Sequence, residues 1–220
     1  MPTVHEGEQG GIVPSKEPLP PRDPALALVE LKEVLGRIAP KLEQLLRDYA
    51  AQTGHLQVNE TCPFGTPGAC SILCDALAFA LIKDGYLVDL MKVTGLPPEV
   101  FGFSDHEILW VTIPRGEDYM IDPSYLQCLL RWDLPVAGQE PFAVFPMGSE
   151  RDQAVLIAGQ DRDVQGRLQK MWGNSAISES HEIFLDIKAA LNGHLAPEVM
   201  QSRTVDQAIF HGLLARAGWI

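Results

Sequence analysis

A short apolar helix that carries a cysteine in its first turn is the feature that most constrains the fold of this chain. Apolar side chains recur at near-helical spacing over residues 70–83, and Gly85 ends the run. The preceding loop, residues 62–68, holds two prolines and two glycines and is not expected to be helical. Cys70 is therefore expected at a helix N-terminus, where free N–H groups and the helix dipole favour a thiolate. Cys70 is a candidate nucleophile, and a small buried thiol is the alternative use of a cysteine there.

Two strands that carry chemically useful side chains are expected further along the chain. Residues 104–113 predict a strand led by His106, and residues 118–125 predict a second strand in which Asp122 lies. Residues 114–117 are typical of a turn, so the strands should form an antiparallel hairpin. A loop of odd length places His106 and Asp122 on one face, and an even loop does not. Such a histidine and aspartate are the base and the orienting group that activate a thiol.

These motifs together resemble the transglutaminase-like branch of the papain-like cysteine enzymes. The shared pattern is Gly-x-Cys at a helix start (Gly68 to Cys70), a glycine-led strand over residues 85–93, a histidine on the next strand, and then Asp-Pro beginning at Asp122. The matching stretch covers residues 68–125. The resemblance implies an α+β fold in which the nucleophile helix packs on a small antiparallel sheet. It also implies a catalytic triad of Cys70, His106 and Asp122.

Two positions qualify the resemblance. The aromatic residue that commonly follows the family histidine by two positions is Ile108 here, and Trp110 is displaced by two further positions. Papain-like enzymes use a side-chain amide upstream of the cysteine to bind the oxyanion, which makes Gln57 the candidate by analogy, with Asn59 nearby. A solvated loop amide is the alternative role for Gln57.

The triad implies acyl transfer through a thioester, with an amide or thioester carbonyl in a protein, peptide or small molecule as the substrate. Resolution of the thioester by water gives a peptidase or deamidase, and resolution by an amine gives a transglutaminase-type acyltransferase. Hydrolysis is favoured slightly as the commoner outcome. An interaction module that keeps the fold without the activity is the alternative from a different class. No cofactor is expected.

The net charge and the cysteine spacing limit the classes of partner and ligand that this chain is expected to bind. The formal net charge is −12 and no Lys/Arg run occurs, which argues against nucleic acid and against anionic membrane surfaces. No apolar run approaches the length that spans a bilayer. The four cysteines lack the paired spacing of a zinc site, so no metal is expected. No Sec-type signal is visible at the start, so a cytoplasmic location with free thiols is expected, and export by a route without such a signal stays open.

The expected organisation is a flexible tail over residues 1–24 and one domain over residues 25–220. Residues 25–51 predict two short helices or one helix bent at Pro40, covering the core. The catalytic core should span about residues 55–146, with a short strand near its end at residues 141–146. The remainder, residues 147–220, is expected to be mostly helical, with segments at 152–172, 179–191 and a last helix from Thr204 to about Ala217. His181 is a rival base, although a surface or capping histidine is the favoured interpretation.

Overall fold

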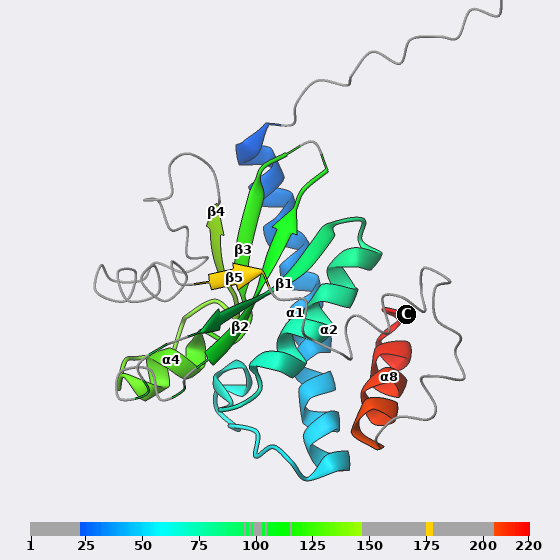
Figure 1. Cartoon of the computed structure of the whole chain (residues 1–220), viewed down its shortest axis with the longest axis vertical. Coiled ribbons are helices and arrows are strands. Elements are labelled where there is room, and N and C mark those ends of the chain that lie inside the picture. The colour runs from blue at the N-terminus through cyan, green and yellow to red at the C-terminus, as the bar shows by residue number, and fades with distance from the viewer. Residues whose placement is uncertain are drawn as a thin grey trace, which may run out of the picture.

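The structure is a computed structural model that describes residues 23–94, 96, 98, 103, 105–114, 116–146, 175–177 and 205–220. Within these residues the fold is α+β, with an antiparallel sheet of strand order β4-β3-β2-β1-β5 and helices packed against it (Figure 1). The elements are α1 (Pro24–Thr53), the 3-10 turn η1 (Pro63–Gly65), α2 (Cys70–Lys83), β1 (Leu87–Thr94), β2 (Asp105–Thr112), β3 (Asp118–Asp122), α4 (Leu126–Arg131), β4 (Ala143–Pro146), β5 (Ser175–Ile177) and α8 (Val205–Ala217).

The first helix, α1, runs without interruption through Pro40. Proline removes the hydrogen bond to the carbonyl four residues earlier, that of Gly36. Both Pro40 and Gly36 are exposed, so water can hydrate that carbonyl. The Asp23 side chain caps the start of α1 by accepting from the Ala25 N–H at 3.0 Å. Of the two predicted forms, a pair of short helices is therefore wrong, because the solvent-facing position of Pro40 lets one helix continue.

Helix α2 occupies the centre of the molecule, and its predicted bounds, residues 70–83, are confirmed. Every residue from Ile72 to Leu81 is buried. The helix packs against α1 and against β1 and β2, so α2 covers one face of the sheet (Figure 1). The preceding loop contains no α-helix, as expected, although it includes the single turn η1.

The predicted hairpin is formed by β2 and β3. Their register pairs Leu109 with Ile121 and Thr112 with Asp118. The connection is therefore residues 113–117, an odd number, so His106 and Asp122 lie on the same face of the sheet. The odd loop length that the shared face requires is therefore present. Strand β1 pairs with the other edge of β2, placing Val93 opposite His106.

The later part of the chain was predicted less completely. The strand near residues 141–146 and the last helix are confirmed as β4 and α8, but α4 and β5 were not predicted. Strand β5 pairs with β1, so residues 147–220 are not purely helical. The helices expected at 152–172 and 179–191 lie outside the described residues. Helix α8 packs on α1, where the rings of Phe210 and Tyr49 meet edge to face at 6.3 Å. None of the described helices is long and apolar enough to cross a bilayer.

Candidate active site

The Cys70 thiol lies at the first residue of α2, and the helix start there carries no capping side chain. The N-cap residue is Ala69, which has no side-chain hydrogen-bond acceptor, and the first helical bond runs from the Leu73 N–H to the Ala69 carbonyl at 2.9 Å. Gly68, with φ at 76°, turns the chain into the helix in a left-handed conformation that glycine adopts without strain. The N–H groups of the first turn are thus not occupied by a cap and are positioned to stabilise negative charge near the sulfur.

Cys70 is the accessible thiol among the four cysteines, all of which lie in the described part of the chain and are unpaired. Cys62, Cys74 and Cys128 are buried, whereas Cys70 is partly exposed. Burial raises the pKa of the Cys62 thiol and raises those of Cys74 and Cys128 well above the ordinary value. The Cys74 thiol also donates a hydrogen bond to the Glu107 carbonyl at 3.2 Å. Cys74 is therefore a buried thiol held by a backbone hydrogen bond.

The histidine and the aspartate form a buried pair. His106 Nε2 lies 2.9 Å from Asp122 Oδ2, and each residue is only 1% exposed. The other carboxylate oxygen, Oδ1, accepts from the Ser124 N–H at 2.9 Å and from the Ser124 hydroxyl at 3.2 Å. Both oxygens of Asp122 are therefore engaged, which fixes the carboxylate and, through it, the imidazole plane.

The electrostatics of this pair favour a charged imidazole. Burial acts to lower the pKa of His106, but the Asp122 carboxylate, by its charge and its hydrogen bond, raises it. A hydrogen bond and a charge interaction with Cys70 act in the same direction, and together these effects raise the pKa of His106 to about 10. Since Nε2 is committed to Asp122, Nδ1 is the ring nitrogen left to exchange a proton with Cys70. The surroundings of His106 therefore favour the protonated imidazole beside the Cys70 sulfur.

Two further side chains, those of Gln127 and Phe103, contact the imidazole, and neither contact was predicted from the sequence. The Gln127 side-chain nitrogen, on α4, lies 3.2 Å from His106 Nδ1 and 3.3 Å from the Ser124 hydroxyl. Gln127 is only 8% exposed, and it lies in a helix whose neighbouring residues are apolar. A polar residue in that position is the signal from which the contact could have been suspected. The ring of Phe103 stacks on the imidazole, with centroids 5.1 Å apart and planes at 22°.

The oxyanion candidate Gln57 lies elsewhere. It is exposed and lines an open depression of about 580 Å³, formed mainly by residues 55–60 with Pro67, in which neither Cys70 nor His106 takes part. The side-chain oxygen of Asn59 accepts from the N–H groups of Thr61 at 3.1 Å and Cys62 at 3.0 Å, so this amide holds the loop. The structure therefore does not bring Gln57 into the group around the thiol. The rival base His181 lies outside the described residues.

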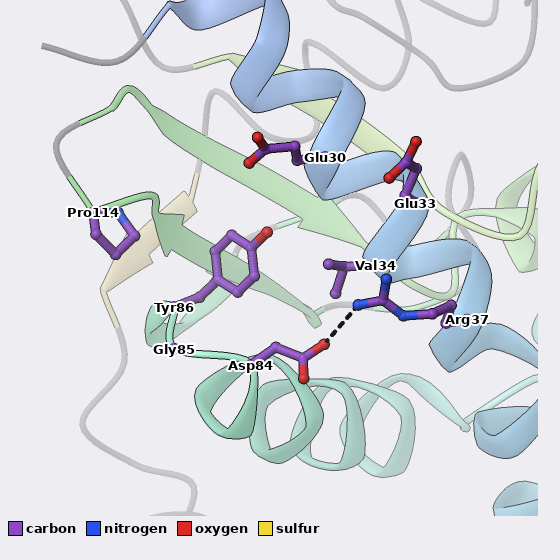
Figure 2. Close-up of a pocket in the computed structure, with 8 residues that line it drawn as sticks. All are labelled: Glu30, Glu33, Val34, Arg37, Asp84, Gly85, Tyr86 and Pro114. Carbon is purple, nitrogen blue, oxygen red and sulfur yellow. Dashed lines mark hydrogen bonds and ion pairs between the residues drawn. The ribbon is translucent and has the colours of Figure 1, made fainter.

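A separate pocket of about 300 Å³ lies at the far end of α2 from the thiol (Figure 2). It is formed by α1, the turn after α2 and the hairpin connection, and Arg37 pairs across it with Asp84 at 3.5 Å. Helix α2 has 14 residues, so about 20 Å of helix separates this pocket from Cys70. The pocket is thus not part of the candidate active site.

A partly exposed thiol at an uncapped helix start, next to a buried histidine–aspartate pair, can act chemically as an activated nucleophile. Comparison of the sequence with protein-family models, with curated proteins and with solved structures gave no match. The geometry of the site itself is therefore the basis on which a function can be inferred.

Proposed function

We propose that this protein is a cysteine-dependent acyl-transfer enzyme that attacks amide or thioester carbonyls and hydrolyses the resulting acyl-enzyme. The observation that carries the proposal is the position of His106, which interacts with the accessible thiol of Cys70 and holds Asp122 at 2.9 Å through its other ring nitrogen. This is the geometry that a thiol nucleophile, a general base and an orienting group need. The resemblance of residues 68–125 to transglutaminase-like enzymes agrees with these roles.

In the first half of the proposed reaction, the Cys70 thiolate attacks the carbonyl carbon while its former proton resides on His106. The tetrahedral intermediate collapses when the bond to the leaving group breaks, and the proton on Nδ1 passes to the leaving amine or thiol. The product is a thioester on Cys70 and a neutral His106. Asp122 keeps Nε2–H fixed throughout, so that Nδ1 is the nitrogen that takes and gives the proton.

In the second half, neutral His106 accepts a proton from water at Nδ1, and the hydroxide attacks the thioester carbon. The bond to sulfur then breaks, which releases the acid and returns the thiolate–imidazolium pair. During both additions negative charge develops on the substrate oxygen. The uncapped N–H groups at the start of α2 are the groups placed to stabilise it, together with the N–H of Cys70 itself.

A test that distinguishes hydrolysis from transfer combines a glutamine-containing protein with a labelled primary amine. Hydrolysis predicts ammonia release or chain cleavage that exceeds amine incorporation, and the Cys70→Ala variant should lose all of it. Incorporation that dominates would reassign the enzyme as a transglutaminase-type acyltransferase, the alternative that uses the same triad. Absence of reaction across varied amides and thioesters would instead support an interaction module on this fold.

A further inference from the structure

The side chain of Gln127 is in contact with the nitrogen at which the proposed proton transfer takes place. Its amide nitrogen lies 3.2 Å from His106 Nδ1, and the same nitrogen lies 3.3 Å from the Ser124 hydroxyl. Ser124 in turn donates to Asp122, so Gln127 belongs to a closed ring of contacts around the imidazole. All four residues are buried, which makes a mismatched hydrogen bond among them costly.

A fixed amide cannot match both protonation states of this nitrogen. Neutral Nδ1 is an acceptor and can pair with the N–H of Gln127, whose amide nitrogen lies 3.2 Å away. Protonated Nδ1 is a donor, and an amide nitrogen facing it would place two donors together. A rotation of the amide by about 180° presents its oxygen instead, because a glutamine amide carries a donor and an acceptor at almost equal positions.

We propose that Gln127 is a positioning residue whose amide reverses each time His106 gains or loses the proton of Cys70, so that Nδ1 keeps a matched partner in both states. This inference rests on the proposed function in naming Cys70 as the proton donor. Its test does not depend on the proposed function, because it needs no substrate. In the reversed state the Ser124 hydroxyl can turn its single proton from Asp122 Oδ1 to the amide oxygen, while Oδ1 keeps the Ser124 N–H. The reversal would therefore be accommodated inside the ring of buried contacts, with no exchange of solvent.

Several titratable groups affect the pKa of His106 and therefore contribute to any pH titration of its imidazole. Asp122 on β3 and Cys70 on α2 act directly on the imidazole. The thiols of Cys74 and Cys128 remain neutral over most of the accessible range, because burial raises their pKa values well above the ordinary value. Lys92 and Glu107 act at longer range through their interactions with the thiols. The variants below leave all of these groups in place.

The proposal is tested by nitrogen NMR of the full chain, without substrate, over the pH range in which His106 titrates. The side-chain amide resonances of Gln127 should shift with the same midpoint as the imidazole nitrogens. The Gln127→Met variant preserves the side-chain volume and should leave that midpoint almost unchanged. It removes the donor to the neutral imidazole and the acceptor to the protonated imidazole, so both states lose a partner. The Gln127→Glu variant presents only acceptors and should raise the midpoint by about one pH unit or more.

Each contrary outcome is specific. A higher midpoint in Gln127→Met would show a fixed donor, a lower midpoint would show a fixed acceptor, and either result overturns the reversal. Wild-type amide resonances that stay unchanged through the His106 titration also overturn it, and this measurement needs no variant that must fold. The exposed Gln52→Met substitution on α1 is the matched control and should change neither set of resonances. Because no turnover is measured, failure here is distinguishable from failure of the proposed function.

Discussion

At the scale of single residues, the four cysteines differ in their surroundings far more than in their sequence context. Cys70 is partly exposed at a helix start and interacts with His106, whereas the other three are buried. Cys74 lies one turn further along the same helix. A comparison of Cys70 with Cys74 therefore shows how position on the helix affects the reactivity of a thiol. The accessible thiol beside an imidazolium should be the reactive one.

We therefore expect iodoacetamide at mildly acidic pH to alkylate Cys70 well before the other three cysteines. The reason is that the Cys70 thiol is accessible beside His106, whereas Cys74 is buried and burial raises the pKa of its thiol. Peptide mapping by mass spectrometry after brief labelling gives the order. Equal labelling of all four thiols, or faster labelling of Cys74, would remove Cys70 from its proposed role.

His106 and Asp122 are expected to make separable contributions to the rate of turnover. His106→Ala should reduce turnover by about 10³-fold or more and slow alkylation of Cys70 at acidic pH, because the proton acceptor is lost. Asp122→Asn should fold but lose most activity, because an amide facing Nε2 allows the wrong tautomer. Steady-state rates and circular dichroism check both variants. Full activity in either variant would contradict the assignment of His106 and Asp122 to the triad. The His181→Ala variant, which removes the rival base, should retain activity.

At the scale of the elements, the turn before α2 determines where the thiol points. Gly68 has φ at 76°, and a Cβ there would meet the Leu56 side chain at an ordinary contact distance of 3.8 Å. A substitution therefore introduces backbone strain rather than a clash. Gly138 has φ at 77° and nothing within 4 Å of its Cβ position, so it offers the same strain away from the candidate site.

Gly68→Ala and Gly138→Ala should each destabilise the fold by roughly 1–2 kcal/mol, the strain of a left-handed alanine. Only Gly68→Ala should also slow alkylation of Cys70, by shifting the first turn of α2 away from His106. Urea unfolding and the alkylation rate measured on both variants separate the two effects. Equal alkylation rates in the two variants would show that this turn does not position the thiol.

The elements that carry strong local signals were predictable, and those stabilised by distant contacts were not. The apolar run ending at Gly85 defined α2, and the turn residues 114–117 defined the β2–β3 hairpin. The six-residue helix α4 is too short for a clear periodicity, and β5 is a three-residue strand that depends on its pairing with β1. Gln127 was missed for the same reason, because its contact with His106 arises only when α4 packs beside the sheet. Proximity in sequence also did not place Gln57 beside the thiol, because the loop directs it into a separate open depression.

At the scale of the whole molecule, one continuous hydrophobic core joins α1, α2, the sheet and α8. Cys62, Cys74 and Cys128 belong to this core, and His106 and Asp122 are also buried, so the ionisation of these groups is coupled to folding. The folded-state pKa of His106, about 10, is above the ordinary value of 6.5, so the pair stabilises the fold at low pH and this contribution is lost as pH rises between those values. The raised pKa values of Cys74 and Cys128 act in the same direction above about pH 9.

The free energy of unfolding should therefore decrease steadily from about pH 7 to about pH 10. Denaturant unfolding at a series of pH values measures this dependence. The His106→Ala variant should show a flatter profile below pH 9, where the histidine contribution dominates. A wild-type stability that rises over this range would contradict the raised pKa of His106.

The central claim is that Cys70 forms a thioester with the help of His106. The most direct measurement is the intact mass of the protein after incubation with thioester and activated amide substrates, followed by mapping of the modified peptide. We expect one acyl group on Cys70 in the wild-type protein, persistence of the adduct at low pH, and a much lower yield in His106→Ala. An acyl group found on another residue, or an equal yield at Cys70 in the wild type and His106→Ala, would contradict the account.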